Sequence, residues 1–175
     1  MRAPFHPSRA GITLVEAVLS MLVLAVLATA ALAAVSQSRR ARALVDEQSM
    51  GASLARSMLA EITALPYMEP SSTSIGVDSG ESQSLRGTLD DVDDYNLYAE
   101  SPCTTRDGAP VDGTDTWRRT VVVSWVPVSA NTTPTGSDTG LKRVWVTVRH
   151  GDRVVARLSA LRAEAWDDVL AVGGL

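Results

Sequence analysis

One apolar segment near the N-terminus constrains this chain more than any other feature. Residues 12–35 read ITLVEAVLSMLVLAVLATAALAAV, twenty-four residues with a single charge, that of Glu16. An α-helix rises about 1.5 Å per residue, so such a segment spans about 36 Å, more than the ~30 Å hydrocarbon core of a bilayer. We therefore expect residues 12–35 to form a membrane-spanning helix, preceded by a basic leader at residues 1–11.

The composition argues against several classes of function. The chain has 175 residues and a formal net charge of −4, so nucleic acid is not an expected partner, because phosphate binding needs clustered Lys and Arg. A single cysteine, Cys103, excludes an intramolecular disulfide and a cysteine-based zinc site, and we expect it to be buried or unreactive. With only His6 and His150 as histidines, the sequence offers no convincing nucleophile and base, which predicts that the protein is not an enzyme.

Three interpretations of the N-terminus compete. A secretory signal would have a shorter apolar core followed by small residues, such as those at 28–34, at its cleavage site. A plain signal anchor fits the length, and basic residues flank both ends of the segment, so charge alone does not set its orientation. Neither interpretation gives Glu16 a purpose, although a carboxylate in a membrane helix costs free energy and is by default a functional candidate.

The third interpretation rests on residues 11–16, which read GITLVE. This run resembles the processing motif of type IV prepilins and type II secretion pseudopilins, in which a basic leader ends in Gly and a Glu is the fifth mature residue. The resemblance implies that a prepilin peptidase cuts between Gly11 and Ile12 and that the new amine of Ile12 is methylated. It also implies that Glu16 meets the amine of a neighbouring subunit during assembly. The family usually has Phe at the position of Ile12.

The resemblance further implies a cellular setting. The protein would sit in the inner membrane as a single-pass subunit with its C-terminal domain in the periplasm, and would then join a pilus or pseudopilus. Its partners would be the prepilin peptidase and methylase, other pilin or pseudopilin subunits, and the inner-membrane assembly platform.

Two features favour a minor pilin or I-type pseudopilin over a main structural subunit. Residues 52–61, ASLARSMLAE, look similar to the helix of those proteins, and the chain lacks the C-terminal cysteine pair of many major pilins. An unprocessed single-pass membrane protein with an extracytoplasmic binding domain remains the alternative, and a membrane-anchored enzyme is a second one.

The helix should continue well beyond the membrane, over residues 36–65. Apolar or small residues recur every three or four positions, which is the period of an amphipathic helix: Gly51, Ala55, Met58, Ile62 and Leu65. Pro66 then predicts its end, because proline cannot supply the next backbone hydrogen bond.

Residues 66–116 predict an irregular region, since they are rich in Ser, Thr, Gly and Pro. Within it lie four aspartates, which would repel one another unless hydrated or bridged by a cation: Asp90, Asp91, Asp93 and Asp94. We expect a hydrated acidic loop or contact patch, with Ca²⁺ as the other possibility and no cofactor required. The spacing is not that of an EF-hand, although calcium sites occur in loops of some pseudopilins.

The last part, residues 117–175, predicts an antiparallel sheet. Alternation of apolar and polar residues marks strands at 119–126, 141–149 and 154–160, the last two joined as a hairpin by residues 150–152. We expect His150 to be a solvated turn residue, and the tail from Glu164 to form a short helical turn. A long N-terminal helix on a small antiparallel sheet is an α+β fold, which is also the architecture of pilins.

Overall fold

The computed structural model describes residues 11, 13–69, 72 and 74–172. The chain divides into two compact units, Met1–Val45 and Asp46–Leu175. Helix α1 (Leu14–Thr63) contributes to both, and each unit is described by itself. The helix ends two residues before the expected Leu65, whose N–H still bonds to the carbonyl of Ile62 at 3.1 Å.

The part of α1 in the first unit is apolar and buries almost nothing. Its best window has a mean hydropathy of 2.6, and none of that window is buried among the described residues. By length and composition, α1 can therefore cross a membrane. Large apolar side chains are exposed on all sides of the helix between Leu14 and Val35, so no single face of this stretch is polar.

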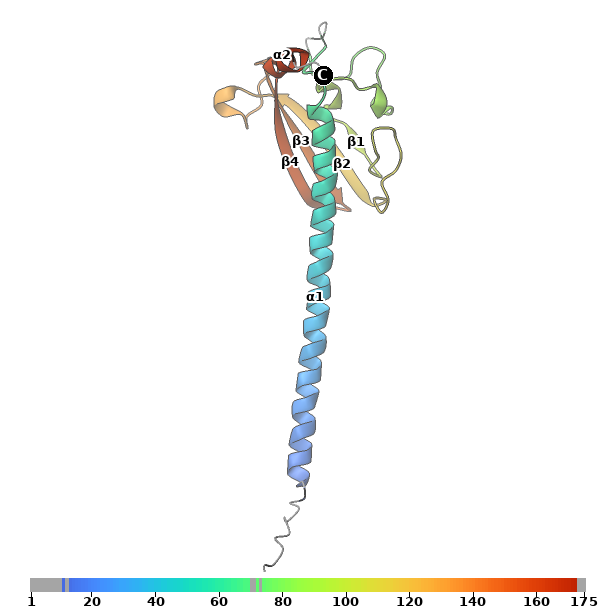
Figure 1. Cartoon of the computed structure of the whole chain (residues 1–175), viewed down its shortest axis with the longest axis vertical. Coiled ribbons are helices and arrows are strands. Elements are labelled where there is room, and N and C mark those ends of the chain that lie inside the picture. Colours follow the sequence, from blue (N-terminus) through green and yellow to red (C-terminus); the bar gives the residue numbers. More distant parts are fainter. Residues whose placement is uncertain (1–10, 12, 70–71, 73, 173–175) are drawn as a thin grey trace, which may run out of the picture. The chain divides into compact units, whose positions relative to one another are not determined.

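The second unit is built on a four-stranded antiparallel sheet in the order β1-β2-β3-β4 (Figure 1). Its strands are β1 (Ala99–Glu100), β2 (Trp117–Trp125), β3 (Leu141–His150) and β4 (Arg153–Ala163), followed by α2 (Ala165–Val172). Short 3-10 helices η1 (Arg86–Thr88), η2 (Asp93–Tyr95) and η3 (Val128–Ala130) lie in the connections. The expected α+β class is confirmed, as is the hairpin of β3 and β4.

The core lies between one face of the sheet and the end of α1. Alternation on β2 and β3 turns five valines inward, where they join an apolar stripe of the helix. The stripe residues are Leu54, Ala55, Met58, Leu59 and Ile62; the valines are Val121, Val123, Val144, Val146 and Val148. The apolar periodicity predicted for the helix is therefore explained by its packing against the sheet.

A β-bulge corrects the predicted alternation of β4. Val148 pairs with Ala156 but Arg149 pairs with Val154, so Val155 is the extra residue of the bulge. The alternation predicted for residues 154–160 places Val154 on the same face as Ala156, but the side chain of Val154 is exposed. Val155 packs against the core instead, opposite Gly51 of α1.

His150 is not the solvated turn residue that the sequence predicts. It is the last residue of β3, and Gly151, with a positive φ of 55°, begins the turn. Its ring stacks on Trp117 with the centroids 4.6 Å apart, while Nδ1 lies 2.8 Å from Glu47 Oε1 of α1. The ring therefore ties the hairpin to the helix.

Buried ion pairs fasten the irregular connection between α1 and β2. Arg119 of β2 donates to Glu100 Oε1 at 2.5 Å and to the carbonyl of Leu54 in α1 at 3.0 Å. Arg86 of η1 donates to Glu61 of α1 and to Glu100, both at 3.1 Å. An unpaired charge at these positions would be costly, so the pairs fix how the connection lies on the helix and sheet.

Replacing Gly51 tests the contact between helix and sheet. A Cβ at Gly51 would lie 2.8 Å from Cγ1 of Val155, so Gly51→Leu must push the bulge away from the helix. Overpacking typically costs about 1–3 kcal/mol, and the better helix propensity of leucine returns only about 1. We expect a net loss of up to about 2 kcal/mol, measured on the full chain in detergent by tryptophan fluorescence, because all four tryptophans belong to the second unit.

Ser53→Leu is the matched control, since Ser53 is exposed on the same helix. It should change the free energy of unfolding by no more than about 0.5 kcal/mol. Equal effects of the two variants would show that the close approach at Gly51 does not matter.

Candidate functional site

The first candidate site is the segment that precedes α1. Gly11 is exposed, and a Cβ added to it would meet nothing within 4 Å. Nor does its φ fall in the positive region that favours glycine. The described structure therefore gives no steric reason for a glycine here. Ile12, the expected first mature residue, lies outside the described residues, as do residues 1–10.

Thr13 begins the helix as an N-cap. Its hydroxyl oxygen accepts a hydrogen bond from the backbone N–H of Glu16 at 3.3 Å, and its carbonyl accepts from Ala17 at 3.1 Å. Thr-x-x-Glu is the sequence pattern of a capping box, in which the glutamate is also suited to the helix dipole. Sequence reasoning missed this second role of Glu16, although the pattern stands in residues 13–16.

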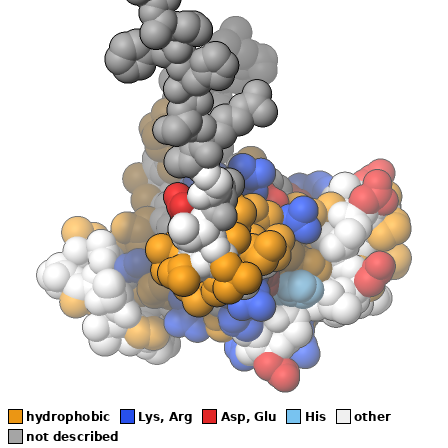
Figure 2. Space-filling model, turned by 90° about the horizontal axis from the view of Figure 1, so that it is seen from below, with side chains coloured by type: hydrophobic (Ala, Val, Ile, Leu, Met, Phe, Trp, Pro, Cys, Tyr) orange, Lys and Arg blue, Asp and Glu red, His pale blue; other side chains and the backbone are white. Residues whose placement is uncertain are grey.

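Glu16 lies in the first turn of α1 and is exposed among apolar side chains. Figure 2, which looks from below, shows hydrophobic side chains gathered around the beginning of the helix. Its neighbours Leu14, Val15 and Val18 are all more than half exposed. Within the described part of the chain, the carboxylate forms no ion pair, so it is available to a positive group outside this subunit.

The second candidate site is the acidic loop, and here the expectation of a hydrated patch is wrong. Asp91, Asp93 and Asp94 are at most 1% exposed, and only Asp90 faces solvent. Asp93 pairs with Lys142 of β3, whose Nζ lies 2.6 Å from Oδ1 and also donates to the carbonyl of Tyr67. The Asp93 carboxylate is thus paired with the buried Lys142 ammonium, whereas the other three aspartates have no such partner among the described residues.

Backbone hydrogen bonds hold the other two buried aspartates. Asp91 accepts from the N–H groups of Asp93 and Glu69 at 2.9 Å, while Asp94 Oδ2 accepts from those of Asp90 and Asp91 at 3.1 Å. Short-range bonds of this kind are how aspartates organise turns. They place the loop firmly against the segment that follows α1.

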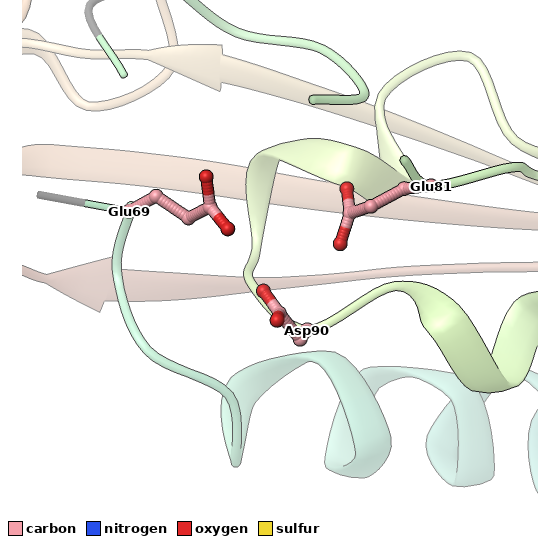
Figure 3. A group of neighbouring side chains, drawn as sticks. All are labelled: Glu69, Glu81 and Asp90. Atoms are coloured by element: carbon pink, nitrogen blue, oxygen red, sulfur yellow. The ribbon is translucent and has the colours of Figure 1, made fainter. Parts of the chain in front are cut away.

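Three further carboxylates join the loop, which sequence reasoning did not anticipate. Oxygen atoms of Glu69, Glu81 and Asp90 lie within 4.8 Å of one another, as do those of Asp78, Asp91 and Asp94. Figure 3 shows the first three side chains converging from different segments of the chain. Only the aspartates at 90–94 stood out in the sequence, because the others are scattered through a Ser- and Gly-rich connection.

Cys103 is buried in the hydrophobic core, as expected. Burial raises the pKa of its thiol to about 11, so the reactive thiolate is disfavoured at neutral pH.

The comparisons with known proteins bear on the first candidate site. A family model described as the prokaryotic N-terminal methylation motif matches residues 6–32, which covers the end of the leader and the first part of α1. No curated protein and no solved structure matches the chain. The chain thus carries the N-terminal methylation motif, consistent with the type IV prepilin and pseudopilin family, at the head of a long helix and a pilin-like α+β fold.

Proposed function

We propose that this protein is a structural subunit of a type IV pilus or type II secretion pseudopilus. The observation that carries the proposal is the methylation motif at residues 6–32, directly joined to a helix whose apolar first part is uncovered. A helix that is apolar on all sides must be surrounded by lipid or by other helices. Lipid would surround the helix in a membrane-held precursor, and neighbouring helices would surround it in a filament core.

Processing would occur between Gly11 and Ile12. Nothing in the described fold requires glycine at position 11, so the motif's glycine is better explained by the active site of a peptidase that must approach the backbone closely. Cleavage there leaves a positive amine on Ile12, next to the N-cap residue Thr13.

Glu16 would then set the position of one subunit against the next. A carboxylate in a low-dielectric helix bundle interacts strongly with a positive amine, and that interaction is lost when the partners shift along the helix axis. The intrasubunit capping box explains an acidic or amide residue at position 16, whereas the filament contact requires a negative charge. The two roles are therefore separable by substitution.

The motif suggests a structural subunit rather than an enzyme. Among filament subunits we favour a minor or tip-associated one, on the similarity of residues 52–61 to minor pilins and I-type pseudopilins. The precursor would span the inner membrane once, with the sheet in the periplasm. Its partners would be the prepilin peptidase, fellow subunits and the assembly platform.

Substituting Gly11 tests the processing step. We expect Gly11→Val to abolish cleavage in membranes that contain an active prepilin peptidase, because the added side chain blocks the scissile bond. The thermal stability of the precursor should stay unchanged, since a Cβ at Gly11 meets nothing within 4 Å. Gel mobility and mass spectrometry report the cleavage, and membranes with an inactivated peptidase are the control. Normal cleavage of Gly11→Val would contradict the assignment of the site.

Substituting Glu16 tests assembly. Gln fits the capping-box pattern as well as Glu, so Glu16→Gln preserves the start of the helix and removes the charge alone. We expect normal cleavage but at least about a tenfold loss of incorporation into sheared filaments, measured by immunoblotting; a tenfold change corresponds to about 1.4 kcal/mol. Glu16→Asp, which keeps the charge, is the matched control and should retain more incorporation than Glu16→Gln.

Unchanged incorporation of Glu16→Gln would contradict the filament contact of Glu16. Absence of both the wild type and Glu16→Gln from sheared filaments would favour the alternative, an unprocessed single-pass protein with an extracytoplasmic binding domain. That protein would also keep its leader in membranes with an active peptidase. The two variants together therefore separate the two functions.

A further inference from the structure

Six carboxylates meet in the second unit without a cation. The first group, Glu69, Glu81 and Asp90, is partly open to solvent; the second, Asp78, Asp91 and Asp94, is more deeply placed. Among the described residues, none of the six forms an ion pair with Lys, Arg or His. The other buried carboxylates of this unit contrast with them, since Asp93 binds Lys142 and Glu100 binds Arg86 and Arg119.

Three oxygen atoms of this cluster are buried and accept no hydrogen bond from an N–H or hydroxyl group within the described structure. They are Asp78 Oδ2, Glu81 Oε1 and Asp94 Oδ1. Asp94 is the clearest case, because its side chain is 99% buried and its other oxygen already accepts two backbone N–H groups. A buried carboxylate oxygen without such a donor is costly, and a bound ion is one way to offset that cost.

The two groups act electrostatically as one cluster. Burial, together with a hydrogen bond shared with the Glu81 carboxyl, raises the pKa of Asp94 to about 8. Burial and then Asp78 raise the pKa of Glu69, and burial and then Glu81 raise that of Asp90. Asp91 and Asp78 of the second group contribute to the raised pKa of Asp90 after burial and Glu81, so Asp94, Glu69 and Asp90 each lie in the negative field of a carboxylate from the other group. A cation placed among them would relieve this repulsion.

We propose that these six carboxylates form a Ca²⁺-binding site. Calcium takes six to eight oxygen ligands at about 2.3–2.6 Å in flexible geometry, which suits carboxylates contributed by several loops. Mg²⁺ demands a strict octahedron and retains its waters, so it fits a crowded carboxylate cluster poorly. A surface hollow of about 330 Å³, lined by Glu69, Asp90, Asp91, Pro66 and Met68, gives the ion access.

The site would fasten the end of α1 to the irregular region. Glu69 follows the helix, Asp78 and Glu81 belong to the connection, and Asp90, Asp91 and Asp94 flank η2. One ion would therefore cross-link three chain segments that have little regular structure of their own. The proposed set differs from the four aspartates that the sequence suggested, because it omits Asp93, which pairs with Lys142, and adds Glu69, Asp78 and Glu81.

Calcium titration of the full chain in detergent tests the proposal directly. At pH 7.5, after chelation, we expect saturable Ca²⁺ binding by calorimetry and a rise of about 5–10 °C in the melting temperature of the second unit at a hundredfold excess over Kd. Mg²⁺ at the same concentration should bind at least about tenfold more weakly. Absence of binding at 5 mM Ca²⁺, or equal binding of Mg²⁺, would overturn the assignment.

Glu81→Gln distinguishes a metal site from a structural role. Without Ca²⁺ this variant should be as stable as the wild type or more stable, because it removes like-charge repulsion while Gln can still accept from the N–H of Asp78. With Ca²⁺ it should lose at least about tenfold in affinity. Asp115→Asn, which removes an exposed carboxylate outside the cluster, should bind like the wild type. Equal calcium affinity of Glu81→Gln and wild type would overturn the proposal.

Discussion

The apolar surface of the first half of α1 must be covered, and the functional account depends on what covers it. This part of the helix presents large hydrophobic side chains at successive positions, with Glu16 as its one acidic group near the start. Water is a poor solvent for such a surface, and lipid or neighbouring helices are good ones. A carboxylate is expensive in either setting unless a positive group meets it. The amine released by cleavage before Ile12 is such a group, so one event would create the anchor's free end and the partner of Glu16.

The second unit solves a different problem, which is how to hold an irregular connection of about fifty residues on a small sheet. Buried ion pairs hold this connection in position. Arg86, Arg119 and Lys142 are buried and each contacts a carboxylate from another segment. Such pairs contribute little net stability, but they disfavour every arrangement in which one partner stays buried alone. The unpaired carboxylates around Asp94 fit the same scheme if a calcium ion supplies the positive charge.

Local patterns in the sequence were sufficient for the helix and the sheet. Alternation located the inner valines of β2 and β3, and the apolar run with its three- and four-residue spacing located α1, because both signals come from residues close together in the chain. The signals failed where the cause is distant. Asp93 is buried because Lys142 lies 49 residues further on, and His150 is held by Glu47, 103 residues earlier. The bulge at Val155 likewise packs against Gly51 on the helix, and the sequence of β4 itself does not predict the bulge.

The N-terminus of the protein in its own membrane tests the central claim most directly. We would extract the chain from native membranes and determine its intact mass and N-terminal sequence. The account predicts a mature chain that starts at Ile12 and carries one methyl group on its amine. A chain that still starts at Met1, in cells with an active prepilin peptidase, would contradict it and would leave the apolar helix as a plain anchor. Cleavage among residues 28–34 would contradict it as well, since the protein would then be released without Glu16.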